Sequence, residues 1–327
     1  MIQYTIFGES HGPAIGVVIT GLPSGLPLDM DAVAAEMARR APGQDNTSTP
    51  RKEKDKVEIL SGMFEGKTTG TPLCGVIYNT DTRSKDYSKL KDMPRPSHAD
   101  YTASVRYGGC SDYRGGGHFS GRLTAPLVFA GALAKQLLAQ RGIAIESKID
   151  LLGGVKHPTA EQIDEIILAA KADRDSVGGA VACSVSGVPA GFGAPDLGEN
   201  AEGIFAKHLF AVPGVKGIEF GAGFDFASMR GSEANDPFYM DGDVVKTLTN
   251  HAGGINGGIT NGAPITFRVA FKPTSSISRP QQTFNFATGE MDTLQVKGRH
   301  DVCFALRTPV IVEAMTAIAL ADLITLK

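Results

Sequence analysis

Two long segments of the chain are apolar almost all the way round a helix, and they are its strongest structural signal. They cover residues 123–140 and 309–326, and each carries a proline in its first turn, where the missing amide costs nothing. Charged side chains such as Lys135 and Glu313 interrupt them, and both are too short for a membrane span. Since a helix without a solvent face needs cover on both sides, the pattern predicts a helical layer enclosed between sheets. A third, amphipathic helix is predicted over residues 160–172.

Two sequence blocks occur twice in the same order. Residues 21–26 (GLPSGL) match 187–192 (GVPAGF), each after a strand-like alternating run, and residues 62–73 match 254–265 at glycine, threonine and proline positions. Chance similarity of Gly-Pro turns is the alternative. We infer two pseudo-equivalent halves, because order and spacing agree. Neither half should fold alone, so the sequence predicts a single domain over residues 1–327.

Composition narrows the class of protein. With 42% hydrophobic residues the chain can build an ordinary globular core, so dominant disorder is excluded. A formal net charge of −3 gives no global attraction to nucleic acid or an anionic membrane. Forty glycines and eighteen prolines indicate many turns and close backbone approaches. Two charge-rich segments, residues 51–56 and 80–93, are expected to be exposed.

The cysteines and the N-terminus favour a reducing cytoplasm. The four cysteines lie far apart, without a CxxC pair or a histidine at zinc-ligand spacing, so neither a disulfide framework nor a metal site is predicted. Met1 leads directly into an alternating segment, without the basic and apolar regions of a signal peptide. We therefore expect a cytoplasmic protein.

Two histidines stand in loops suited to chemistry. GESHG follows the N-terminal strand, and its glycines free the backbone so that Ser10 and His11 project from a strand end. In PRPSHADY, two prolines stiffen the approach and hold Arg95 and His98 at fixed positions. The alternatives are an ordinary loop histidine and a rigid exposed loop. A Ser-His triad is disfavoured, because neighbours in sequence cannot form one without special geometry and no GxSxG is present.

Further loops rich in glycine and hydroxyls could hold an anion. YRGGGHFSGR at residues 113–122 leads into the first buried helix, whose amides favour a phosphate, although it fits neither a Walker loop nor GxGxxG. NHAGGINGGITNG at residues 250–262 is followed by KPTSSI at 272–277, where amides, hydroxyls and one lysine suit a phosphate. KGRHD at residues 297–301 corresponds in the repeat to the loop around His118. A flexible connection is the alternative for the glycine run.

Together these loops predict a local cationic site within a mildly acidic protein. Each charged hydrogen bond is worth roughly 1.5–3 kcal/mol, so a few arginines can hold a small polyanion without bulk positive charge. The cations concerned are Arg39, Arg40, Arg51, Arg95, Arg114, Arg122, Lys272 and Arg299. For each of them, a solvated surface position is the alternative.

In combination these loops resemble the chorismate synthase family. The resemblance runs from Phe7 to the C-terminal helix, through GESHG, RPSHADYT, YRGGG, NHAGG, KPTSSI and GRHD in this order. It implies an α+β fold, a β-α-β sandwich in which long buried helices lie between antiparallel sheets, assembled as a homotetramer. It also implies reduced FMN as cofactor, which some members of the family reduce themselves with NADPH.

The resemblance further implies a reaction. The substrate 5-enolpyruvylshikimate 3-phosphate would lose phosphate and a ring hydrogen in a 1,4-elimination that yields chorismate, without net redox change. The C–H bond is not strongly acidic, so a reduced flavin would supply what side chains cannot. His11 would protonate or stabilise the departing phosphate, His98 would keep a proton near the flavin N1 edge, and Asp301 would assist proton removal from N5.

Matching positions imply the binding residues as well. Those for the flavin are His118, Phe119, Ser120, Pro213, Gly214, Gly257, Lys272, Pro273, Thr274, Ser275, Ser276 and Arg299. Those for the substrate are Ser10, Arg39, Arg95 and Arg122. Arg40 and Asn46 match positions assigned in the family to the reduced nicotinamide nucleotide.

The chain departs from the family pattern in two places. The usual loop GGGRSSARETA reads GGGHFSGRLTA here, so His118 and Phe119 replace Arg and Ser, and Leu123 replaces Glu. A third arginine after Arg40 is Ala41 in this chain. Backbone contacts to the flavin could survive such changes, whereas one anion contact is expected to be missing.

A non-enzymatic sensor of phosphate or flavin nucleotide is the alternative from another class. A sensor needs cations and amides but has no use for three ionisable groups poised for proton transfer, so His11, His98 and Asp301 favour an enzyme. RNA binding through residues 51–56 is disfavoured by the interspersed acidic residues and the lack of aromatic residues. The expected partner is a small-molecule substrate, not nucleic acid or a membrane.

Overall fold

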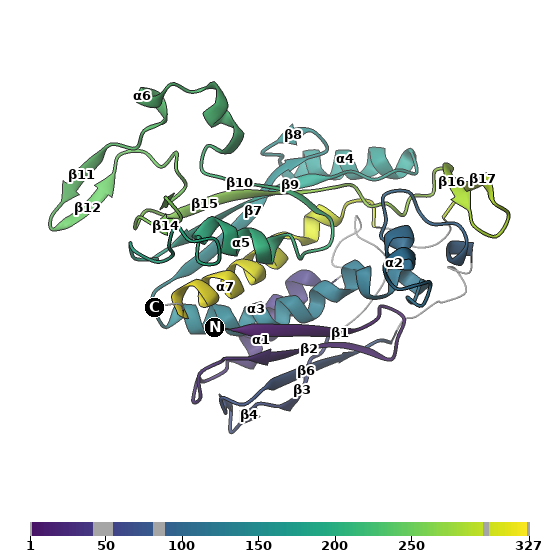
Figure 1. Ribbon diagram of the computed structural model, residues 1–327, viewed down its shortest axis with the longest axis horizontal. Coiled ribbons are helices and arrows are strands. Elements are labelled where there is room, and N and C mark those ends of the chain that lie inside the picture. Colours follow the sequence, from purple (N-terminus) through teal and green to yellow (C-terminus); the bar gives the residue numbers. More distant parts are fainter. Residues whose placement is uncertain (1, 42–54, 81–88, 297–300, 326–327) are drawn as a thin grey trace.

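The computed structural model describes residues 2–41, 55–80, 89–296 and 301–325, which form two antiparallel sheets around a layer of helices (Figure 1). The first sheet has the order β1 (Gln3–Gly8), β2 (Ala14–Thr20), β6 (Leu73–Tyr78), β3 (Glu58–Ser61). The second has the order β10 (Val215–Phe220), β15 (Ile265–Phe271), β9 (Gly179–Ser186), β7 (Ala144–Leu152), β8 (Val155–Lys156). The helices between them are α1 (Met30–Arg40), α3 (Thr124–Ala139), α5 (Ala201–Leu209) and α7 (Pro309–Thr325). The predicted α+β sandwich is confirmed.

The predicted buried helices are also confirmed. The segments expected over residues 123–140 and 309–326 are α3 and α7, and their side chains form the centre of the apolar core. The amphipathic segment is α4 (Ala160–Ala172), which starts at a capping box made by Thr159 and Gln162. Within the described ranges, no helix is long and apolar enough to cross a membrane.

Helices α3 and α7 cross in direct contact. A Cβ atom on Gly131 would lie 2.3 Å from the Cα and Cβ atoms of Ala314, so only glycine permits this approach. The charges that interrupt the two apolar patterns, Lys135 and Glu313, form an ion pair with each other. Arg39 donates to both carboxylate oxygens of Glu313, at 2.7 and 2.8 Å. Burial would raise the pKa of Glu313, but the hydrogen bond from Arg39 and the charge of Lys135 outweigh it and lower this pKa.

The repeated blocks form the same turn in both halves. Thr68 Oγ1 donates to the carbonyl of Pro23 at 2.5 Å, and Thr260 Oγ1 donates to that of Pro189 at 2.7 Å. Each hydroxyl also accepts the amide three residues after that proline, at 3.0 Å in both halves. Matching hydrogen bonds at matching positions speak against chance similarity. Because one apolar core draws on both halves, we infer that the chain folds as a single domain.

The expectation of exposed charge-rich segments is wrong at three positions. Asp55, in the segment 51–56, is buried. Leu90 and Met93, in the segment 80–93, are buried in a small cluster with residues at the end of the last hairpin. A run of charges indicates that a segment is polar on average. Which of its side chains is buried against an ion-pair partner or an apolar cluster depends on the fold.

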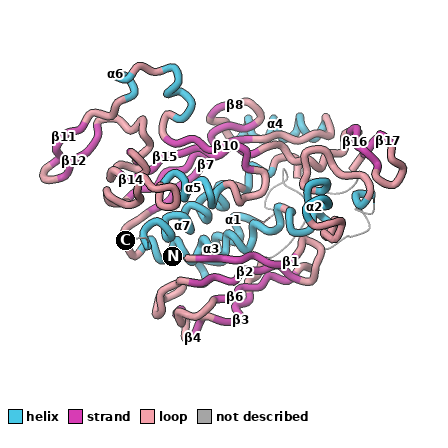
Figure 2. The backbone as a smooth tube through the Cα atoms, viewed as in Figure 1, coloured by secondary structure: helices cyan, strands magenta, loops and turns pink. Residues whose placement is uncertain are grey.

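The shorter elements gather at the two ends of the sandwich. The end at which β1 stops carries loops, α2 (Asp100–Arg106) and a hairpin of β16 (Gln281–Asn285) and β17 (Glu290–Leu294), as Figure 2 shows. The other end carries an arm made of α6 (Gly231–Ala234), β11 (Phe238–Asp241) and β12 (Val244–Thr247). The remaining short elements are β4 (Met63–Phe64), β5 (Lys67–Thr68), β13 (Ile255–Asn256), β14 (Ile259–Thr260), η2 (Arg114–Phe119), η3 (Gly121–Leu123), η4 (Gly223–Ser228) and η5 (Phe304–Arg307).

Candidate active site

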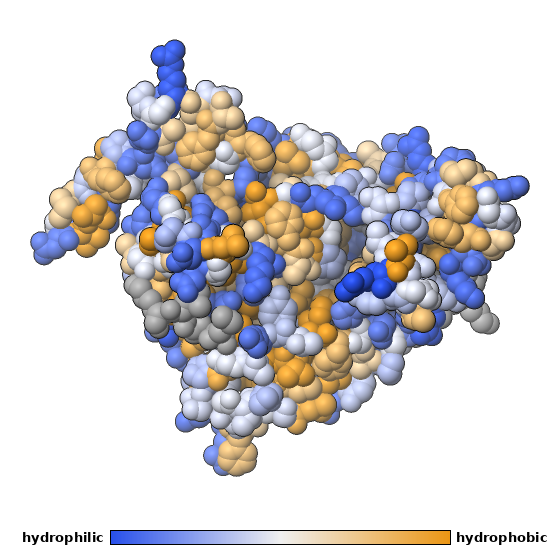
Figure 3. Space-filling model, viewed as in Figure 1, coloured by the Kyte–Doolittle hydropathy of each residue, from blue (hydrophilic) through white to orange (hydrophobic). Residues whose placement is uncertain are grey.

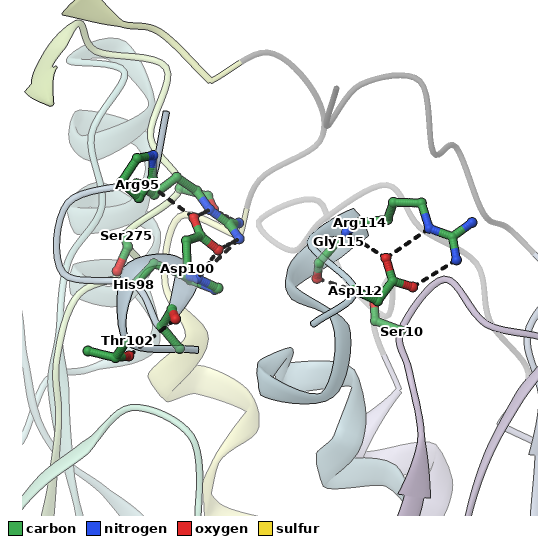
Figure 4. Close-up of polar contacts among 12 residues, drawn as sticks. Ser10, Arg95, His98, Asp100, Thr102, Asp112, Arg114, Gly115 and Ser275 are labelled. Carbon is green, nitrogen blue, oxygen red and sulfur yellow. Dashed lines mark hydrogen bonds and ion pairs between the residues drawn. The ribbon is translucent and has the colours of Figure 1, made fainter. Parts of the chain in front are cut away.

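The loop after β1 buries Ser10 and His11 against a run of three glycines. Ser10 donates from its amide to the carbonyl of Gly117 at 3.1 Å and from Oγ to that of Gly115 at 3.2 Å (Figure 4). The φ angles of Gly115, Gly116 and Gly117 are 60°, 84° and 52°, which glycine adopts without strain. A Cβ atom on Gly115 would lie 2.5 Å from Nε2 of His11, so the imidazole packs directly on this backbone.

His98 approaches the next residue of the same run. A Cβ atom on Gly116 would lie 3.1 Å from Cε1 and 3.2 Å from Nε2 of His98. The Nε2 atoms of His11 and His98 therefore both face the backbone of two consecutive glycines. The fold brings together the two histidines that the sequence singled out, and the glycine run is what leaves room for both.

Arg95 and Asp100 surround His98 with charge. The Arg95 guanidinium donates from Nε and Nη2 to the two oxygens of Asp100, at 2.7 Å each, and from Nη1 to Ser276 Oγ at 2.8 Å. Nδ1 of His98 lies 2.6 Å from Asp100 Oδ1. The pKa of His98 is lowered, chiefly because burial disfavours the charged ring and also because Arg95 lies close, whereas Asp100 acts in the opposite direction.

A second buried cluster supports the His11 loop. Arg40 Nε lies 3.3 Å from Asp55 Oδ2, and Arg122 donates from Nη1 to Asp55 Oδ1; all three side chains are buried. Arg122 Nε also donates to Asn79 Oδ1 at 3.3 Å. In turn, Asn79 Nδ2 donates to the backbone carbonyls of Glu9 and Gly12, on either side of His11, at 3.1 and 2.9 Å. The cluster thus connects two arginines to the backbone of a catalytic candidate.

The KPTSSI loop lies against the loop of His98. Lys272 Nζ donates to Ser275 Oγ at 2.6 Å, and Ser275 Oγ donates to the carbonyl of Ser97 at 3.0 Å. The pKa of Lys272 is lowered by burial and then by the positive charges of Lys216 and Arg95.

This loop fits a phosphate-bearing cofactor. Thr274 Oγ1 is buried and has no hydrogen-bond partner among the described residues. A buried hydroxyl normally has a partner, and a lysine with neighbouring hydroxyls is a common phosphate-binding set. Lys272, Thr274, Ser275 and Ser276 could therefore hold a phosphate group. Gly214 joins them, because its carbonyl accepts from the Lys272 amide at 2.9 Å, with Pro213 preceding it and Pro273 following the lysine.

Two predicted cations lie in other surroundings. Arg39 is bound to Glu313 in the helical layer and is not part of the group formed by Arg40 and Arg122. Neighbouring residues of a helix project about 100° apart, so two adjacent arginines cannot face one site equally. Arg114 is half-exposed and donates from two nitrogens to Asp112, at 2.8 Å each.

The residues after the glycine run form a link to the first strand. His118 Nδ1 donates to the carbonyl of Gly8 at 2.9 Å, with the ring exposed. Phe119 lies with its ring centroid 6.2 Å from that of Tyr107. Ser120 Oγ accepts from the amide of Arg122 at 3.2 Å, which caps the short helix before α3.

The last predicted residues are spread more widely. Asp301 accepts a hydrogen bond from Arg307. Gly257 lies in the turn between β13 and β14, at the far end of β15 from Lys272, so within one chain it is not part of the group. Arg299 and Asn46 lie outside the described residues.

Two surface cavities of the described residues lie away from this site. A cavity of about 440 Å³ is lined by Phe220, Phe224 and Phe226, and one of about 370 Å³ lies on the second sheet around Ser184 and Arg268. Neither is lined by a histidine or by a residue of the KPTSSI loop. Convergent ionisable groups carry more chemical information than hollow volume, and they point to the glycine run.

Comparison with known proteins decides the family. A family model described as chorismate synthase matches residues 2–325. The chain belongs to the chorismate synthase family. A chorismate synthase of Chitinophaga pinensis is 50% identical over 327 residues, which cover 100% of this chain and 96% of that protein. One of Methanothermobacter thermautotrophicus is 45% identical over 345 residues, covering 98% and 92%.

A solved structure agrees with this family assignment. A crystal structure of chorismate synthase superposes with a TM-score of 0.75 at 26% identity, covering 98% of this chain and 91% of that one. The structure places Leu123, where the pattern of the resemblance has Glu, in the core. Relative to the pattern of the resemblance, Ala41 and His118 each replace an arginine and Leu123 replaces a glutamate.

The sequence did not single out Asn79 or assign Asp55 and Asp100 a role in the site. Asn79 directly follows β6, and a polar side chain at a strand end is a signal that could have been used. Asp55 carried no such signal, because it lies in a charged segment whose composition predicts solvent exposure.

Proposed function

We propose that this protein is a chorismate synthase, which converts 5-enolpyruvylshikimate 3-phosphate to chorismate and phosphate. The observation that carries the proposal is the meeting of His11 and His98 on one glycine run, beside the cationic groups Arg95 and Lys272. The substrate bears a phosphate and two carboxylates, and cationic side chains are suited to bind such groups. The family and its curated relatives support the same reaction.

The chain's own residues would divide the work of a 1,4-elimination. His11 is proposed to protonate or stabilise the departing phosphate, and Arg122 and Arg95 to bind the anionic groups. His98 would keep a proton at the edge of the cofactor, and Asp301 would take one up. Reduced FMN, when bound, would supply an electron and accept the hydrogen of a C–H bond that no side chain is basic enough to break. The loop from Lys272 to Ser276 would hold its phosphate.

Anaerobic turnover tests this function. Incubation with the substrate and chemically reduced FMN is expected to release chorismate and phosphate in equal amounts, followed by absorbance and a phosphate assay. Omission of the flavin should abolish both products. Folded protein that gives neither product would contradict the proposal and favour a sensor, which would bind flavin without turnover.

The use of NADPH is a separate part of the proposal. The same assay with oxidised FMN and NADPH measures whether the chain reduces its own flavin. Chorismate formed with NADPH and oxidised FMN would show that the chain reduces its own flavin. Turnover only with chemically reduced FMN would show that it does not.

We also propose a cytoplasmic homotetramer that binds neither nucleic acid nor membranes. Figure 3 shows apolar residues along the projecting arm, and Phe238, Met240 and Val245 are 71%, 61% and 55% exposed. Exposed apolar surface of this kind is typical of a protein interface.

Replacing Phe238 and Met240 with serine is expected to yield smaller particles than the wild-type protein. Light scattering after gel filtration should give about four times 34.3 kDa for the wild type and a lower mass for the double variant. Met291→Ser, on the other hairpin and 65% exposed, is the matched control and should leave the mass unchanged. A monomeric wild type, or a double variant of unchanged mass, would contradict this use of the arm.

A further inference from the structure

Asp100, at the start of a short helix, is buried and holds several hydrogen bonds, unlike an ordinary surface carboxylate. It accepts hydrogen bonds from the backbone amide of Arg95 at 3.0 Å and from Nε and Nη2 of the same residue at 2.7 Å each. Its Oδ1 also lies 2.6 Å from Nδ1 of His98. The side chain is 4% exposed, so these contacts replace water almost completely.

The local backbone explains how these groups meet. The amide of His98 donates to the carbonyl of Arg95 at 3.2 Å, which closes a tight turn, and Ser97 within it has a φ angle of 59°. The chain then enters α2, whose first residue is Asp100. This reversal places one carboxylate beside a guanidinium five positions earlier and an imidazole two positions earlier.

The proton on the imidazole can be assigned from these distances. Nδ1 of His98 lies 2.6 Å from Asp100 Oδ1 and 3.1 Å from Nη2 of Arg95. An unprotonated Nδ1 would accept from Arg95 but would set its lone pair against the carboxylate oxygen at the shorter distance. A protonated Nδ1 donates to that oxygen, and Nη2 already has Asp100 as acceptor. The proton therefore belongs on Nδ1, and Nε2 is left as the free acceptor facing Gly116.

We propose that Asp100 is a positioning residue of this site, which fixes the Nδ1-H tautomer of His98 and the orientation of Arg95 with one carboxylate. Its effect on catalysis rests on the proposed function of His98, whereas its effect on the imidazole does not. A carboxylate behind a histidine makes the exposed nitrogen a better proton acceptor and stabilises the cation once formed. The other charged groups that act on His98 are Arg95 and Lys272, and both favour the neutral ring.

Burial would raise the pKa of Asp100, yet the hydrogen bonds from Arg95 and His98 hold it well below its usual range. The carboxylate therefore stays ionised at any pH at which His98 titrates. Loss of its charge should lower the pKa of His98 further, because burial, Arg95 and Lys272 would then act unopposed.

The test uses the intact protein labelled with ¹⁵N-histidine, without substrate or cofactor. The chain has seven histidines, so His98 is assigned by comparison with His98→Ala. In the wild type, long-range ¹H–¹⁵N spectra are expected to show the proton on Nδ1 of neutral His98. A proton on Nε2 in the wild type would overturn the proposal, whatever the variants do.

Titration of the variants gives the second measurement. Asp100→Asn is expected to lower the pKa of His98 by about one unit or more, since an opposite charge in contact shifts a pKa by about one to three units. Asp112→Asn is the matched control, because Asp112 is likewise held by two nitrogens of an arginine but does not contact His98 (Figure 4). If the pKa of His98 is unchanged in Asp100→Asn, Asp100 only supports the structure of the loop and does not act on the imidazole. This result would overturn the proposal.

Turnover separates this inference from the proposed function. In Asp100→Asn, the pH profile of kcat should shift together with the pKa of His98. In Asp112→Asn, the pKa of His98 should keep its wild-type value. If the wild type shows no turnover, the proposed function fails, but the tautomer and the titration still decide the role of Asp100.

Discussion

His11→Ala is expected to lower turnover about 10²–10⁴-fold, the usual contribution of a positioned acid or base. Its imidazole is buried and packs on Gly115, and in the proposed mechanism its removal would leave the departing phosphate without a proton donor. His98→Ala should cause a loss of the same order, since its Nε2 faces the next glycine. Anaerobic turnover with reduced FMN measures both effects.

The control for this prediction is an exposed histidine. His157 has a side chain that is 71% exposed and a φ angle of 47°, which asparagine tolerates, so His157→Asn should keep wild-type turnover. All three variants should retain a cooperative thermal transition, which shows that they fold. Wild-type turnover in His11→Ala or His98→Ala would remove that histidine from the mechanism.

Asp55→Asn is expected to lower the free energy of unfolding by about 3–5 kcal/mol, as for the loss of one partner from a buried ion pair. Arg40 and Arg122 both contact this carboxylate, and all three side chains are buried. Asparagine keeps the shape of the side chain and tolerates its φ angle of 43°, so the change removes the charge and one of the two acceptors that face the arginines. Urea unfolding followed by circular dichroism, at one protein concentration, measures the difference.

A surface ion pair provides the matched comparison. Asp175 pairs with Arg279 at 3.3 Å, and their side chains are 38% and 61% exposed, so Asp175→Asn should leave the unfolding midpoint unchanged. Asp55→Asn with the stability of the wild type would show that other groups neutralise the two buried guanidiniums. A loss of turnover larger than the loss of folded protein would show that the cluster also supports the turn of His11 through Asn79.

Local patterns predicted the elements well. The two helices without a polar face are buried between sheets, because nothing else can cover an apolar surface on all sides. The repeated Gly-Pro blocks form turns with the same threonine hydrogen bonds, because turn chemistry depends on a few neighbouring residues. The motifs with His11 and His98 identified loops that meet in space.

The same patterns failed where long-range partners decide. Arg39 and Arg40 are identical in type and adjacent, yet one binds Glu313 in the helical layer and the other Asp55 beside the site. Gly257, which the resemblance assigns to the flavin together with Lys272, lies at the other end of β15 within one chain, and its role stays a prediction. Sequence spacing carries no information on which of two neighbouring side chains meets a group 15 residues away and which meets one 274 residues away.

The sequence by itself determined the layered architecture, the repeat, the family and the loops that carry the histidines, because apolar periodicity and turn residues act locally. Only the tertiary structure decided that Gly115 and Gly116 seat two imidazoles, that Asp55 is buried between two arginines, and that Asp100 holds the proton of His98 on Nδ1. These are contacts between charges and rings brought close by folding, and their energies depend on distances and burial that no one-dimensional pattern contains.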